Sequence, residues 1–243
     1  MKFRNLLFGL FAILMLGGVA LAQTSPAVAR DLIKRGNAKY LRAEYESAIA
    51  DYGRVSPDAG AAYAQALYNI GVCYYELWRT EDAVAMYREA IRASNNSYPR
   101  AHYSLGVALE DLKRLSEAKQ AYQQAIAMSD GKYPQAYFKL GVLAMNEDDH
   151  EAATSLFKEA IRRAKEPFPT SHNNLGVILA RSGRLLEAER EFELALSQSR
   201  GTLPEASHNL ALCRSLLLDH AGSQSSMRFI AATERAQTIS SMK

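Results

Sequence analysis

The chain has 243 residues, and 29 basic side chains against 26 acidic ones give a formal net charge of +3 at pH 7. A chain this close to neutral lacks the excess of basic side chains that binding a phosphate backbone requires. The charge therefore argues against nucleic acid as a partner.

Residues 1–22 have the pattern of a secretory signal peptide. Two basic side chains precede an apolar run at residues 6–19, and an A-x-A sequence ends at Ala22. The run is shorter than the roughly 20 apolar residues of a membrane span, and no stop-transfer charges follow it. We therefore expect cleavage between Ala22 and Gln23, export to the periplasm or the exterior, and no membrane span after cleavage. The alternative is an uncleaved N-terminal anchor.

After this segment, a period of 35 residues organises the chain. A small residue recurs at this spacing: Gly36, Gly71, Gly106, Gly141, Gly176 and Ala211. An alanine stands twelve positions after each glycine, and an aromatic residue follows four positions later: Tyr52, Tyr87, Tyr122, Phe157 and Phe192. Such a period is typical of a solenoid of stacked units. It predicts a repeat array over residues 23–221, with units at about 29–63, 64–98, 99–133, 134–168, 169–203 and 204–221.

Each unit contains two apolar runs with helical spacing, for example residues 101–112 and 115–126. A proline precedes the first run of the later units, where a helix tolerates it (Pro99, Pro134, Pro169 and Pro204). Thr80, Ser116 and Asp149 are expected as N-caps of second helices. We therefore predict an all-α, helical-repeat solenoid of eleven antiparallel helices between about residues 27 and 218. In it, the glycine permits close helix approach and the aromatic fills the gap toward the next unit.

The C-terminal segment 222–243 leaves two alternatives. The repeat frame continues through Ser223, Met227 and Ile230, which predicts a degenerate capping helix at about 223–236 over the apolar end of the stack. The run of small polar residues at 222–226 is instead typical of a disordered tail.

The two cysteines are not expected to pair with one another. Cys73 and Cys213 occupy the same repeat position four repeats apart. Helices pack roughly 10 Å apart, so the separation is some tens of ångströms. A disulfide needs Cα atoms within about 7 Å.

The pattern of glycine, alanine, aromatic and final small residue resembles the tetratricopeptide repeat family, over residues 29–218. The period is 35 rather than the family's usual length of about 34. The usual glycine of the turn within a unit survives only as Gly183, and the other four turns carry Ala43, Trp78, Lys113 and Asp148. The resemblance implies a right-handed superhelix whose concave face, lined mainly by the first helix of each unit, binds a peptide or protein segment.

The groove positions of that family, transferred residue by residue, predict a peptide-binding face. Its members are Asn37, Tyr40, Tyr68, Asn69, Val72, Tyr75, Tyr103, Val107, Phe138, Val142, Asn174 and Val177. Tyr68, Tyr103 and Phe138 are expected as the dominant anchors, because aromatic side chains bury large areas. The asparagine amides both donate and accept, which suits a peptide backbone. For the valines, the alternative is packing between helices.

No catalytic constellation, metal site or cofactor motif is apparent in the sequence. The histidines lack ligand spacing, and no phosphate loop, nucleophile elbow or metalloprotease helix occurs. We therefore expect a non-enzymatic protein–protein interaction scaffold of the cell envelope or extracellular space, with no cofactor. The alternative is a glycan- or other ligand-binding accessory module that uses the same aromatic face. The sequence leaves the oligomeric state open.

Overall fold

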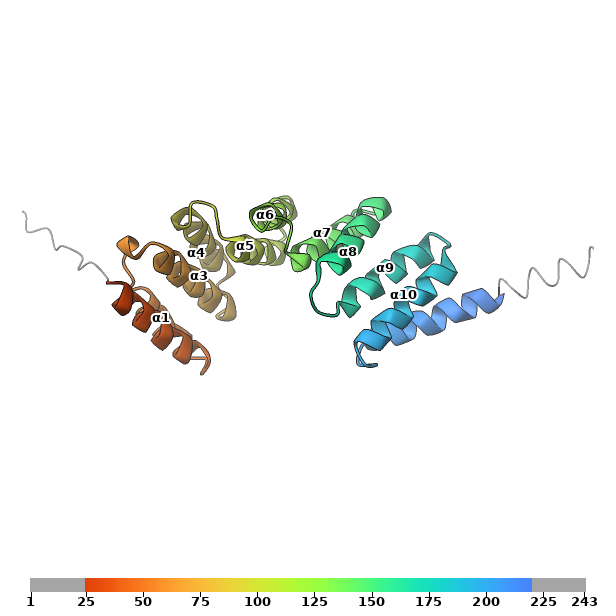
Figure 1. The fold of residues 1–243 in the computed structure, drawn as a ribbon, viewed down its shortest axis with the longest axis horizontal. Coiled ribbons are helices and arrows are strands. Elements are labelled where there is room, and N and C mark those ends of the chain that lie inside the picture. The colour runs from red at the N-terminus through yellow and green to blue at the C-terminus, as the bar shows by residue number, and fades with distance from the viewer. Residues whose placement is uncertain (1–24, 220–243) are drawn as a thin grey trace, which may run out of the picture.

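The computed structural model describes residues 25–219, which form an arch of stacked α-helices (Figure 1). The first helices of the units are α1 (Pro26–Tyr40), α3 (Ala61–Glu76), α5 (Pro99–Asp111), α7 (Pro134–Asn146), α9 (Pro169–Arg181) and a helix at 204–219. The second helices are α2 (Tyr45–Tyr52), α4 (Thr80–Ala93), α6 (Leu115–Met128), α8 (His150–Arg163) and α10 (Leu185–Gln198). A short 3₁₀ helix, η1 (Pro57–Ala59), precedes α3.

These eleven α-helices, with no strand anywhere in the described range, confirm the predicted all-α solenoid. Figure 1 shows α4 and α6 on the outer side of the arch and α3 and α5 on its inner side. The predicted signal segment 1–22 and the predicted cap or tail at 222–243 lie outside the described residues.

The starts of the second helices agree only partly with the sequence prediction. Asp149 caps α8 as expected, and its side chain accepts a hydrogen bond from the backbone N of Ala152 at 3.0 Å. The prediction was wrong for Thr80 and Ser116, which lie inside the first turns of α4 and α6.

Arginine occupies the N-cap position of α4, α6 and α10 instead. The three residues are Arg79, Arg114 and Arg184. Each guanidinium pairs with an acidic side chain three residues further on, with nitrogen–oxygen distances of 2.7, 2.7 and 2.6 Å. The pairing holds the acid in the first turn of the helix, where negative charge is favourable. These helix ends therefore have negative charge in the first turn but no side-chain cap hydrogen bond.

The aromatic ring of each second helix lies directly over the glycine of its own unit. A Cβ atom built at Gly36, for example, would lie 2.4 Å from a ring carbon of Tyr52, and one at Gly176 would lie 2.6 Å from Phe192. The same clash occurs in the other three units, so only glycine fits beneath the ring. We expected the aromatic to reach toward the next unit. The contact that fixes the glycine lies within the unit instead.

The turns within units share one backbone conformation. The residues in place of the usual glycine have positive φ angles of 58° at Ala43, 59° at Trp78, 61° at Lys113 and 58° at Asp148, close to the 75° of Gly183. A left-handed residue at this point ends the first helix. The turn between the two helices is then only three or four residues long. The turn is therefore conserved in shape although the glycine is not conserved in sequence.

Candidate functional site

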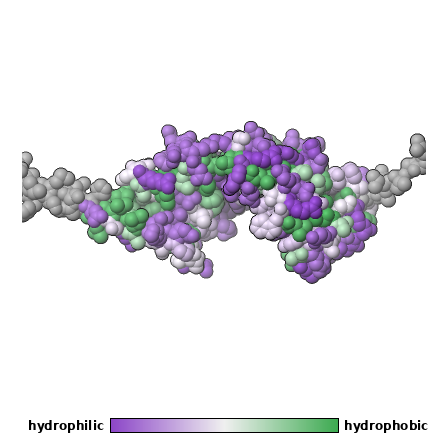
Figure 2. Space-filling view, turned by 180° about the vertical axis from the view of Figure 1, so that it is seen from behind, coloured by the Kyte–Doolittle hydropathy of each residue, from purple (hydrophilic) through white to green (hydrophobic). Residues whose placement is uncertain are grey.

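The predicted peptide-binding residues lie on the first helices α1, α3, α5, α7 and α9, at repeat positions that share one surface of the stack. We call this surface the groove face. Figure 2 shows the molecule from behind, with a hollowed region beneath the middle of the arch. Eleven of the twelve residues keep some exposed surface, whereas Tyr68 is 6% exposed.

Five predicted residues meet in one depression of about 260 Å³ at the N-terminal end of the groove face. We call it the N-terminal hollow. The predicted residues are Asn37, Tyr40, Tyr68, Asn69 and Val72, and the hollow is completed by Tyr52, Gln65 and Arg100. They come from α1, α2, α3 and α5, so stacking of the first three units creates the hollow.

Hydrogen bonds fix the amides of the N-terminal hollow. The Oδ1 atom of Asn37 accepts a hydrogen bond from the Tyr52 hydroxyl at 2.7 Å and another from the Nδ2 of Asn69 at 3.2 Å. The guanidinium of Arg100 lies 5.3 Å from the ring centroid of Tyr68 and forms no ion pair within residues 25–219. An oriented amide pair and an unpaired cation therefore converge on one depression.

The three expected anchors are parts of aromatic clusters with tilted rings. Each lies beside the aromatic residue of its own second helix and beside a second aromatic residue that precedes the next unit's proline. For Tyr68 the ring centroids are 5.7 Å from Tyr87 and 5.3 Å from Tyr98. For Tyr103 they are 5.7 Å from Tyr122 and 5.1 Å from Tyr133, and for Phe138 they are 5.8 Å from Phe157 and 5.3 Å from Phe168. These rings therefore join neighbouring units as well as facing the groove.

Acidic side chains on the groove face were missed by the sequence interpretation. The Tyr40 hydroxyl donates a hydrogen bond to Glu76 at 3.2 Å, and Tyr75 donates to Asp111 in the next unit. Burial, together with the neighbouring carboxylate, raises the pKa of each tyrosine to about 12. Donor and acceptor are 36 residues apart, one more than the repeat period, and this spacing is the signal that could have found them.

In the middle of the groove face, the negative charge of Glu110 is neutralised by a lysine on the same face. Glu110 accepts a hydrogen bond from Tyr122 at 2.7 Å and pairs with the Lys139 ammonium at 3.2 Å. Burial and the Glu110 carboxylate both raise the pKa of Tyr122. A ligand that crosses this region therefore meets a satisfied ion pair rather than a free charge.

The predicted valines and Asn174 have both structural and surface roles. Val72 and Val107 pack against the hydrophobic core of the middle units, and Val142 and Val177 against that of the C-terminal units, yet all four remain partly exposed. Asn174 accepts a hydrogen bond from Asn173 at 3.3 Å. Packing and groove exposure are thus compatible at these positions.

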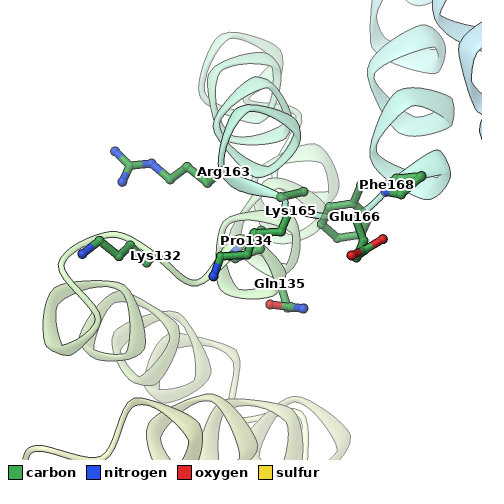
Figure 3. Close-up of a pocket in the computed structure, with 9 residues that line it drawn as sticks. Lys132, Pro134, Gln135, Arg163, Lys165, Glu166 and Phe168 are labelled. Atoms are coloured by element: carbon green, nitrogen blue, oxygen red, sulfur yellow. The ribbon is translucent and has the colours of Figure 1, made fainter.

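A larger depression of about 580 Å³ lies among the loops between units (Figure 3). In Figure 3, Lys132, Pro134 and Gln135 line one side, and Lys165, Glu166 and Phe168 come from the loop after α8. The loop leaves the direction of α8 because the residue after the helix, Ala164, is extended, with ψ of 134°. The groove positions predicted from the sequence are absent from its lining.

Potential metal ligands do not cluster, and the two cysteines lie apart, in the described part of the chain. Residues 25–219 contain no cluster of three potential metal ligands, and Cys73 and Cys213 are both free and buried, as the repeat spacing predicted. His172 is buried and its Nδ1 lies 2.7 Å from Glu191, a structural contact between α9 and α10. None of the described helices has the length and apolar character needed to cross a membrane.

Comparisons with known proteins agree with the helical-repeat fold. The family profile described as "Tetratricopeptide repeat" matches residues 29–98, 77–137, 115–167 and 138–202. No curated protein sequence matches the chain.

Solved structures share the fold at low sequence identity. A MamA protein is 23% identical with a TM-score of 0.59, over 71% of this chain and 92% of that one. MamA from Desulfovibrio magneticus RS-1 is 18% identical with a TM-score of 0.59, over 72% and 97%. YrrB, described as a TPR protein with an unusual peptide-binding site, is 22% identical with a TM-score of 0.57, over 78% and 98%. At these identities the likeness concerns the fold.

Proposed function

Because this chain belongs to the tetratricopeptide repeat family, we propose that it is a non-enzymatic scaffold that binds a peptide or protein segment on its groove face. The N-terminal hollow carries the proposal, since it gathers five of the predicted residues from two first helices into one depression. YrrB, which has a similar fold, is described as having a peptide-binding site.

The chemistry of the hollow suits a peptide backbone. Asn37 and Asn69 present amide groups held in place by hydrogen bonds to each other and to Tyr52. Amides match the alternating donors and acceptors of a peptide. Arg100 adds a cation, and Val72 an apolar surface, at the same place. A preorganised site of this kind reduces the entropy lost on binding.

The packing of the aromatic rings favours a peptide over a glycan. Sugar recognition would use the flat faces of aromatic side chains. Tyr68, Tyr103 and Phe138 each already contact two aromatic neighbours, and Tyr68 is 6% exposed. Tyr68 therefore offers little free face to a sugar, and neighbouring rings already cover part of Tyr103 and Phe138.

Peptide and glycan arrays probed with the purified protein would test this proposal. We expect selective peptide binding, with hydrogen-exchange protection of α1 and α3 in the complex. Glycan binding without peptide binding would support the accessory-module alternative. Hydrogen-exchange protection confined to the outer helices α4 and α6 would refute the groove face as the binding site.

We also propose that the protein is exported, because residues 1–22 have the composition and order of a signal peptide. The mature chain should begin at Gln23 and occur in the periplasm or outside the cell. N-terminal sequencing of fractionated cells measures both. Cytosolic protein that begins at Met1 would contradict the proposal.

A further inference from the structure

A third depression, of about 320 Å³, lies between α9 and the helix at 204–219. We call it the C-terminal hollow. Its lining includes Val177, Ala180, Arg181, Asn209, Leu212 and Leu216. Leu212 is 54% exposed and Leu216 is 40% exposed, although a buried position would be favourable for both. Figure 2 shows hydrophobic surface at this end of the arch.

The two hollows lie on the same face of the molecule. Val72, Val177 and Leu212 each follow the recurring small residue by one position, and Asn69 and Asn209 each precede it by two. Residues at one repeat position occupy equivalent places in a solenoid. The C-terminal hollow is therefore the far end of the groove face, with Leu216 at the repeat position that Glu76 and Asp111 occupy near the N-terminal hollow.

Leu212 does not lie where a sixth second helix would pack. In the five complete units, the aromatic ring of the second helix covers the glycine itself, and the equivalent position here is Ala211. Val107 and Val142, one position after the glycine, stay partly exposed although their second helices are present. An added helix would therefore leave the groove side of Leu212 open.

The rim of the C-terminal hollow can orient a peptide chain. The Nδ2 of Asn209 donates to the Oδ1 of Asn173 at 2.9 Å, so its own carbonyl oxygen remains as an acceptor for a ligand N–H. Arg181 forms no ion pair within the described residues. Binding sites commonly combine an apolar lining with a few placed polar groups. Here Leu212 and Leu216 supply the apolar lining, and the Asn209 carbonyl oxygen supplies a hydrogen-bond acceptor.

We propose that the C-terminal hollow is a specificity subsite that takes an aliphatic or aromatic side chain of the bound segment. The inference rests on the proposed peptide-binding function and adds the direction in which the bound segment lies along the groove face. The partner carries an apolar residue at the end that meets α9 and the helix at 204–219. Its polar part meets Asn37, Asn69 and Arg100 at the other end.

The subsite can be tested without the natural partner, by titrating N-acetyl-leucinamide into the full chain with methyl-labelled leucine and valine. We expect NMR shifts at Val177, Leu212 and Leu216. The Leu212→Asn/Leu216→Asn variant should weaken binding about fivefold or more, because much of the apolar contact is removed. Leu194→Asn is the matched control, since Leu194 is 43% exposed on α10, outside the hollow.

Three results would overturn the subsite. They are no shift at all, shifts of equal size at Leu194, or contacts in the free protein between Leu212 and residues 220–243. The third result would mean that the chain's own segment occupies the hollow.

The array experiment separates this inference from the proposed function. Peptides that protect α1 and α3 but bind the double variant as well as wild type would refute the subsite alone. Leucinamide shifts at Leu212 without any peptide binding would refute the proposed function and leave the apolar site.

Discussion

Gly106 lies directly beneath the ring of Tyr122, sixteen residues further along the chain. A Cβ at position 106 would lie 2.5 Å from the ring, closer than real Cβ contacts. The same pair recurs in each of the five complete units, so this contact explains why the glycine and the aromatic keep their spacing.

Gly106→Ala should destabilise the protein by about 1–3 kcal/mol, because the added methyl group overpacks the helix pair. Urea unfolding followed by circular dichroism measures the change. In a Tyr122→Leu background the same substitution should cost less, since the ring that clashes is gone. Equal costs in both backgrounds would contradict the contact.

Lys113→Gly should stabilise the protein by roughly 0.5–1 kcal/mol, because Lys113 holds a φ of 61° that costs a non-glycine residue energy. The matched control is Gln123→Gly, exposed within α6, which should lose about 1 kcal/mol. Both values come from the same denaturant titration. A loss of stability at position 113 would mean that the left-handed turn is not formed.

Tyr68→Ala should lower stability by about 3–5 kcal/mol, because it removes a buried ring from between two aromatic neighbours. Tyr68→Phe should cost about 1 kcal/mol, since only the 3.3 Å hydrogen bond to Ser104 is lost. Thermal unfolding of both variants shows whether Tyr68→Ala loses more stability than Tyr68→Phe. A stable Tyr68→Ala protein that no longer binds peptide would show that Tyr68 is mainly an anchor.

Asn37→Ala should weaken peptide binding by about 1 kcal/mol, roughly fivefold, because the N-terminal hollow loses an amide and the acceptor that orients Asn69. Fluorescence polarisation with a peptide from the array gives the affinity. Gln123→Ala, exposed on a second helix, should bind as wild type does. Unchanged affinity for Asn37→Ala would remove the hollow from the binding site.

Cys73 should resist alkylation by iodoacetamide at pH 8 in the folded protein and react readily in urea. Burial raises the pKa of its thiol from 9.0 to about 12, and only the thiolate is the nucleophile. Because the folded pKa is the higher one, this group's contribution to stability is complete below about pH 9 and is lost as the pH rises toward 12. Mass spectrometry of the modified peptide measures the reaction, and fast labelling of the folded protein would contradict the burial.

The sequence by itself determined the architecture. The period of 35 residues fixed the units, the all-α class and the separation of the two cysteines, because a repeated spacing must place equivalent residues in equivalent environments. The same periodicity identified the turn positions, where four residues other than glycine keep the left-handed conformation.

Only the tertiary structure decided which groove positions are available to a ligand. Helical phase placed Tyr68, Tyr103 and Phe138 on one face, but their exposure depends on aromatic residues from the loop before the next unit. The pairing of Tyr40 with Glu76 and the two hollows likewise need side chains from neighbouring units. Local spacing determines the direction of a side chain from its own helix, whereas burial is set by the other helices and loops packed around it.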